Sequence, residues 1–161
     1  MQYSLARIVA GLDAVSPGYS SYLNRLTGEV VSCSDDEIDA ADAEPDDIKR
    51  PDWEQEQIER ARAVLASDDW LPLPDSFEIH EYRIMESFAE SQSGRVQDGL
   101  LRALRGSGAF RRFKDALDLL EVRDEWFRYR RQALVEIARE WLEANDLPFD
   151  PADNLDEAGP P

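Results

Sequence analysis

Residues 106–146 read GSGAFRRFKDALDLLEVRDEWFRYRRQALVEIAREWLEAND. We predict that this segment forms the central helices of the fold. It contains two of the chain's four tryptophans and three of its six phenylalanines. Apolar residues recur here at spacings of three and four, which places them on one face of a helix. We therefore predict two consecutive helices. The predicted apolar face of the first helix comprises Phe110, Phe113, Leu117 and Leu120. That of the second helix is wider and comprises Trp126, Phe127, Tyr129, Ala133, Leu134, Ile137, Ala138, Trp141 and Leu142.

The rest of the chain predicts a small sheet and further helices. Residues 19–33 have strand character around a turn at residues 24–28, and residues 70–74 predict an extended edge strand that tolerates proline. Amphipathic patterns predict helices over 4–14, 51–67, 76–90 and 93–106, with Trp53 and Tyr82 among their apolar positions. The fold class is therefore mostly helical α+β, with about six helices and a small β-hairpin or three-stranded antiparallel sheet.

A chain of 161 residues has the length of one domain. We predict a single globular domain over residues 1–147 and an acidic, proline-containing flexible tail over residues 148–161. Residues 34–48 carry eight acids and no base. Such a run repels itself and buries little, so we predict an acidic mobile loop over residues 34–50.

Charge is unevenly distributed along the chain. The net charge is −17, which disfavours nucleic acid and anionic membranes as general partners. Residues 102–131 nevertheless carry nine basic and five acidic residues, a charge of +4, so the remainder carries −21. This positive window indicates where a partner of opposite charge would bind.

The sequence lacks the residues that several kinds of site and segment require. His80-Glu81 begins a zinc-protease pattern, but Ile84 stands where the second histidine is required. Cys33 is the only cysteine, so neither an internal disulfide nor a cysteine-rich zinc site is expected. No apolar run reaches the length of a membrane span, and the first residues lack a signal-peptide pattern. We expect a cytoplasmic protein with no cofactor, no metal, no membrane partner and no catalytic residue, more in keeping with a binding protein than an enzyme.

The candidate site lies at the glycine turn and the basic residues that follow it. Free amides at a helix start and nearby guanidinium groups bind anions. The turn has neither the P-loop pattern nor a dinucleotide fingerprint. The predicted anion- or partner-binding residues are Gly106, Gly108, Arg111, Arg112, Lys114, Arg128 and Arg131. Two simpler interpretations remain open: a tight turn whose arginines pair with nearby acids, and docking of the chain's own residues 34–48.

The leading functional prediction is a noncatalytic cytosolic binding or regulatory module. Its partner would be an unknown protein or a phosphate-containing ligand, with nucleic acid a candidate that the net charge disfavours. The alternative is a metal-assisted hydrolase that uses acidic residues. The two differ in their sites, because a hydrolase needs converging carboxylates in a cleft whereas a binding module needs an exposed positive patch.

Three segments, residues 22–30, 73–85 and 106–115, resemble the uncharacterised bacterial family numbered 0158 in the UPF series. The third segment, with Trp126, Phe127 and residues 137–141 after it, carries the resemblance most specifically. Phe127 stands where the family pattern has tyrosine. The resemblance extends over about residues 1–147 and implies a compact fold. It brings no activity with it.

Overall fold

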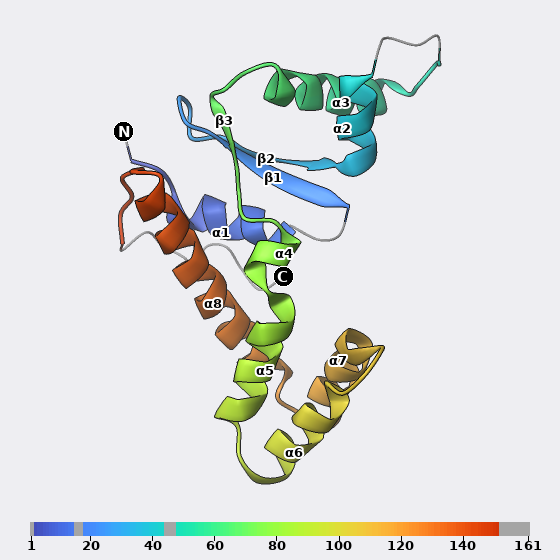
Figure 1. The fold of residues 1–161 in the computed structure, drawn as a ribbon, viewed down its shortest axis with the longest axis vertical. Coiled ribbons are helices and arrows are strands. Elements are labelled where there is room, and N and C mark those ends of the chain that lie inside the picture. Colours follow the sequence, from blue (N-terminus) through green and yellow to red (C-terminus); the bar gives the residue numbers. More distant parts are fainter. Residues whose placement is uncertain (1, 15–17, 44–47, 152–161) are drawn as a thin grey trace. The chain divides into compact units, whose positions relative to one another are not determined.

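The computed structural model describes residues 2–14, 18–43 and 48–151. Figure 1 shows its elements in chain order. They are α1 (Leu5–Ala14), β1 (Tyr19–Asn24), β2 (Val30–Ser34), α2 (Asp35–Asp42), α3 (Asp52–Leu65), β3 (Trp70–Pro72), α4 (Ser76–Ile79), α5 (Glu81–Ser91), α6 (Gly94–Ala103), α7 (Ala109–Leu119) and α8 (Arg123–Ala144). The predicted class, mostly helical α+β with a three-stranded antiparallel sheet, is confirmed.

The chain divides into two compact units. Unit 1 comprises residues 1–78 and 138–159, and unit 2 comprises residues 79–137 with the last two residues. Helix α8 contributes to both units, because the boundary falls within it. The prediction of a single globular domain over residues 1–147 stays a prediction.

The sheet belongs to unit 1 and has the strand order β2-β1-β3. Both pairings are antiparallel; Tyr22 lies opposite Val31 on β2 and opposite Pro72 on β3. Figure 1 shows α1 on one side of β1 and β2, with α2 and α3 on the other. The sheet is therefore covered by helices on both faces.

The face toward α2 and α3 forms an apolar core. Side chains of a strand alternate between the two faces of the sheet, so Val31 and Cys33 share one face. They pack in a buried cluster whose other members are Ala41, Ile58, Ala61 and Val64. On the opposite face, a Cβ added to Gly11 of α1 would lie 2.9 Å from Val30 Cγ1. Glycine at this position therefore lets α1 approach the strands closely.

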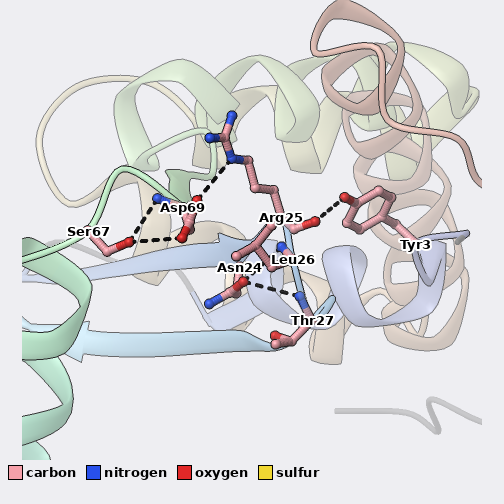
Figure 2. A network of polar contacts seen from close by, with 7 residues as sticks. All are labelled: Tyr3, Asn24, Arg25, Leu26, Thr27, Ser67 and Asp69. Carbon is pink, nitrogen blue, oxygen red and sulfur yellow. Dashed lines mark hydrogen bonds and ion pairs between the residues drawn. The ribbon is translucent and has the colours of Figure 1, made fainter.

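Polar contacts fix the turn between β1 and β2, as Figure 2 shows. The Asn24 side-chain oxygen accepts hydrogen bonds from the backbone N–H groups of Leu26 (2.9 Å) and Thr27 (3.1 Å). Arg25 donates from its backbone N–H to the Asp69 carbonyl and from Nε to Asp69 Oδ1 (3.3 Å). The Tyr3 hydroxyl donates to the Arg25 carbonyl. The turn is thus tied to the start of the chain and to the link before β3.

Unit 2 is built on edge-to-face aromatic packing. The rings of Phe113 on α7 and Trp126 on α8 have centroids 5.0 Å apart at an interplanar angle of 77°. Phe88 of α5 lies 5.4 Å from Trp126 and 6.5 Å from Phe113, also edge to face. Arg130 of α8 pairs with Glu81 of α5 through Nε and Oε1 at 2.7 Å. The predicted core role of Phe113 and Trp126 agrees with this packing.

The predicted loop over residues 34–50 is wrong for residues 35–42, which form α2. Ser34 caps this helix by accepting a hydrogen bond from the Glu37 backbone N–H (3.1 Å). Asp35, Asp36 and Glu37 occupy the first turn, where acids are favourable to the helix dipole. The prediction rested on the number of acids alone, and it did not consider that acids directly after a capping serine favour a helix. Residues 44–47 lie outside the described residues, and mobility of the segment stays a prediction.

The described residues form eight helices rather than about six. One is α2, and the other arises because the predicted helix over 76–90 divides at His80, whose φ is +56°. At the predicted tail, Tyr3 forms a parallel bridge with Phe149 and donates from its N–H to the Pro148 carbonyl. Residues 152–161 lie outside the described residues, so flexibility of the tail stays a prediction.

Three predicted core positions that hold aromatic residues are wrong, and Leu65, another apolar position of the predicted helix over 51–67, is 46% exposed. Phe110 is 52% exposed and Trp53 is 62% exposed, although both fit the apolar spacing. Tyr82 is 42% exposed, and its hydroxyl donates to the Leu104 carbonyl at 3.0 Å. Each stands at the flank of an apolar stripe, where periodicity alone does not decide burial. Trp141 is half-buried rather than buried.

Phe113 and Phe110 give a matched test of this packing on one helix. Replacing the fully buried Phe113 with alanine removes two ring contacts and leaves a cavity, so we expect the free energy of unfolding to fall by roughly 3–5 kcal/mol. Phe110→Ala should cost no more than about 0.5 kcal/mol. Chemical denaturation measures both, and equal losses would contradict this account of unit 2.

Candidate functional site

The turn between α6 and α7 requires its glycines. Gly106 has φ +75° and Gly108 has φ +77°, in the left-handed region where a side chain is strained. Gly108 is also the residue that directly precedes α7, and no side chain caps the start of this helix. The structure thus confirms a tight turn between the two helices at residues 106–108.

Arg112 folds back onto this turn. Its Nε donates to the carbonyl of Ala103 at 3.1 Å, Nη1 donates to the carbonyl of Ser107, and Nη2 donates to that of Arg105. These carbonyls belong to the last residue of α6 and to the turn after it, where backbone acceptors lack helical partners. A Cβ on Gly108 would lie 3.3 Å from Nη1, so glycine leaves room for the guanidinium. The three hydrogen bonds donated by the Arg112 guanidinium therefore stabilise the turn.

The remaining predicted cations differ in exposure. Arg111 and Lys114 are exposed on α7, and their spacing of three residues places them on neighbouring sides of the helix. Arg128 is exposed on α8, whereas Arg131 is half-buried. Arg111, Lys114 and Arg128 therefore carry exposed positive charge at the predicted site. Arg112 is exposed as well, but its guanidinium donates to the carbonyls of the turn.

The sequence missed one residue of the site, Phe110, whereas it included Asp118 among the nearby acids that could pair with the arginines. Phe110, one turn before Lys114, presents an exposed aromatic ring beside this cation. Asp118, one turn after Lys114, carries a negative charge and pairs with Arg123 at 3.5 Å. The periodicity assigned Phe110 to the core and gave no signal of its exposure. The surface combines cations with an aromatic ring and a balancing acid.

The two units differ strongly in charge. Residues 79–137 contain eleven basic and ten acidic residues, a charge of +1, whereas the rest of the chain carries −18. The positive window of residues 102–131 falls entirely within unit 2. The boundary between the units therefore also separates the chain's charge.

Unit 1 has a shallow depression between α1 and β2. It is lined by Arg7, Ala10, Gly11, Glu29, Val30 and Ser32. Near it, the buried Ser21 hydroxyl donates to the Gly11 carbonyl at 2.9 Å and lies 2.8 Å from the Ser32 hydroxyl oxygen. These bonds satisfy the polar groups under the depression. Its lining offers small apolar atoms with one charge of each sign at the rim.

The described part of the chain was searched for a reactive thiol, a metal site and a membrane span. Burial raises the pKa of the Cys33 thiol, and the charge of Glu37 raises it further, while Arg60 acts in the opposite direction. Among the described residues, no group of three or more His, Cys, Asp and Glu side chains is arranged to hold a metal ion. His80 is exposed at the start of α5. Within the same ranges, no helix combines the length and apolar character needed to cross a membrane.

These features define a mostly helical α+β protein with a helical unit of nearly balanced charge and an acidic unit that holds the sheet. The chain belongs to the uncharacterised protein family UPF0158, whose model matches residues 3–160. A UPF0158 protein of Pseudomonas aeruginosa is 28% identical over 148 residues, covering 91% of this chain and 85% of that protein. The resemblance inferred from the three sequence segments is thereby confirmed. No solved structure matches the chain.

Arg112→Lys tests whether this side chain holds the turn. Lysine keeps the charge but cannot present the planar fork that reaches three carbonyls, so we expect unfolding free energy to fall by roughly 1–2 kcal/mol. Its exposed neighbour Arg111 is the control, and Arg111→Lys should change stability by less than about 0.5 kcal/mol. Chemical denaturation and amide exchange at residues 105–109 measure the effect. Unchanged exchange in Arg112→Lys would contradict the assignment.

Cys33 should react slowly with thiol reagents while the protein is folded. Its pKa is raised, so the thiolate fraction at pH 8 is smaller than in an exposed cysteine, and the side chain is only 1% exposed. Iodoacetamide labelling followed by mass spectrometry should be at least about tenfold slower than in urea. The raised folded pKa also means that this group's contribution to stability is lost as pH rises through that pKa. Rapid labelling of the folded chain would contradict the burial of Cys33.

Proposed function

We propose that this chain is a noncatalytic cytoplasmic binding or regulatory module whose partner contacts the exposed cations of α7 and α8. The observation that carries the proposal is the placement of Arg111, Lys114 and Arg128 on the surface of a unit with charge +1, in a chain whose remainder carries −18. A partner of opposite charge is attracted to this surface more than to the rest of the molecule. Gly106, Gly108 and Arg112 have a supporting role, because they shape the turn from which α7 starts.

An acidic protein segment fits this surface best. Arg112, which folds back onto the turn, already donates to three carbonyls, so some of the donors that a compact phosphate would need are already engaged. Phe110 adds an exposed apolar ring next to Lys114, which suits a segment with apolar as well as acidic side chains. A nucleic acid would encounter the net charge of −17. A phosphate-containing ligand and RNA are the other partners to be tested.

The alternative, a metal-assisted hydrolase that uses acidic residues, has no observation in its favour. Such an enzyme needs converging carboxylates that hold the ion. The described ranges, with their gaps at 15–17 and 44–47, contain no such group. The binding proposal therefore rests on a surface whose residues can be named and changed.

The test compares two triple variants with the same change in charge. Arg111→Gln/Lys114→Gln/Arg128→Gln removes the proposed site, and Arg83→Gln/Arg95→Gln/Arg102→Gln removes three exposed cations of the same unit on α5 and α6. Fluorescence anisotropy measures binding of a glutamate-rich peptide containing leucine, of ATP and of a single-stranded RNA. We expect the peptide to bind the wild type, with affinity falling as salt rises.

The first triple variant should bind the peptide at least about tenfold more weakly than the control triple variant. Circular dichroism confirms that both are folded. Equal loss in the two variants would show that overall charge, not this surface, attracts the peptide. If the wild type bound ATP or RNA more tightly than the peptide, that ligand would replace the acidic segment as the proposed partner. If the wild type bound none of the probes, the proposal would be overturned.

A further inference from the structure

The two outer strands of the sheet in unit 1 present unequal edges. In the order β2-β1-β3, both β2 and β3 have one edge without a neighbouring strand. β3 has three residues, of which one is Pro72, and the chain continues to Pro74. β2 has five residues, VVSCS, with neither proline nor charge. Proteins protect exposed edges with short strands, proline and charge, so β3 is protected and β2 is not.

The hydrogen-bond register shows which backbone groups are free. In an antiparallel pair, the residues that exchange hydrogen bonds alternate with residues that point away. Asn24 N–H donates to the Glu29 carbonyl, so Val31 and Cys33 bond to β1 while Val30 and Ser32 point outward. No hydrogen bond among the described residues takes up the backbone N–H or C=O of Val30 or Ser32.

The same reasoning explains the protection of β3. Leu73 N–H donates to the Ser21 carbonyl and Arg25 N–H donates to that of Asp69, so residue 72 lies at an outward-pointing position. Proline at this position has no N–H to offer. The two edges therefore differ in the donors that a further strand needs.

The open edge of β2 borders the depression in unit 1. Ala10 and Gly11 of α1 and Val30 of β2 provide its apolar lining, and Arg7 and Glu29 lie at its rim. Side chains of a strand added along β2 would alternate between the two faces of the sheet, and one set would point toward this depression. Its small lining residues suit side chains such as valine or threonine.

Acidic residues lie at both ends of this edge. Glu29 comes directly before β2, and Asp35 and Asp36 come directly after it; all three are exposed. Five residues lie between Glu29 and Asp35, so the two are six steps apart along the chain, which is roughly 20 Å when extended. Residues 1–78 carry six basic and eighteen acidic residues, a charge of −12. An added strand with basic residues at both ends would match this charge.

We propose that the free edge of β2 binds an extended peptide segment of a partner protein by strand addition, and that the segment carries arginine or lysine at both ends of a short uncharged stretch. The backbone of Val30 and Ser32 supplies the hydrogen bonds. The depression beside α1 takes one side chain, and Glu29, Asp35 and Asp36 select the basic ends. A second copy of this chain is a poorer occupant, because two chains of charge −17 repel each other.

The probe is a fluorescein-labelled peptide of seven residues with arginine at both ends and alternating valine and threonine between. One control peptide has glutamate at both ends, and another keeps the arginines but is N-methylated at alternate amides, which removes its strand-pairing donors. We expect the arginine peptide to bind the full chain at least about tenfold more tightly than either control. Binding should slow amide exchange at Val30 and Ser32, as NMR measures.

Two variants of Ser32 separate the backbone from the side chain. Ser32→Pro removes an outward-pointing N–H, so its affinity for the arginine peptide should be at least about tenfold lower than that of the wild type. Ser32→Ala loses the contact with the Ser21 hydroxyl but keeps the N–H, so it should bind the arginine peptide at least about tenfold more tightly than Ser32→Pro does. We expect a triple variant without the acidic ends to bind the arginine peptide more weakly, with no loss of affinity for the glutamate peptide. The variant is Glu29→Gln/Asp35→Asn/Asp36→Asn. Circular dichroism confirms folding.

The proposal is overturned if the wild type does not bind the arginine peptide, if the N-methylated peptide binds equally, or if a folded Ser32→Pro variant binds as the wild type does. Unchanged exchange at Val30 and Ser32 on binding also overturns it. Sedimentation analysis tests the other occupant. A dimer of the wild type that Ser32→Pro dissociates would assign this edge to a second copy of the chain instead.

Discussion

Unit 2 depends on the edge-to-face contact between Phe113 and Trp126. Their ring centroids lie 5.0 Å apart at 77°, the geometry that aromatic quadrupoles favour. The contact joins α7 to α8, and Phe88 extends it to α5. Because Phe113 is fully buried, the neighbouring positions of α7 have little freedom to rotate. The exposure of Arg111 and Lys114 follows from this fixed orientation of the helix.

Arginines in this unit serve different purposes despite their common charge. Arg112 uses its planar fork to hold three carbonyls of a glycine turn, and Arg130 pairs with Glu81 across two helices. Both arrangements use the several directed donors that lysine lacks. Arg111, Lys114 and Arg128 remain exposed. The charge of a sequence window therefore overstates the charge that a partner can meet.

The proposed surfaces differ in chemistry and lie in different units. The helical surface of unit 2 is cationic and carries an aromatic ring, so it favours an acidic segment. The edge of β2 in unit 1 offers unpaired backbone groups between acidic ends, so it favours a basic extended segment. A module with both surfaces would bring together two partners of opposite charge. Because they share no residue, loss of one surface leaves the other intact, and each can be tested alone.

The sequence by itself determined the elements whose signals are local. Strand character around the turn at Asn24 predicted the hairpin, Gly106 and Gly108 predicted the turn, and the spacing of Phe113 and Leu117 predicted the buried face of α7. Six helices were predicted where the described residues form eight, and the site was predicted only as a glycine turn and a set of basic residues. Helix α2 was missed because a count of acids ignores where they stand relative to a cap.

Tertiary structure alone decided the exposure of Phe110 and the role of Arg112. Phe110 fits the apolar spacing, but burial at the flank of a stripe depends on whether another element packs there. The carbonyls that Arg112 reaches lie five to nine residues before it and converge only once the turn is folded. Likewise, strand pairing decided that the N–H of Ser32 points outward, and that proline occupies an outward-pointing position of β3. Periodicity records which residues share a face, but contacts between distant residues decide what covers it.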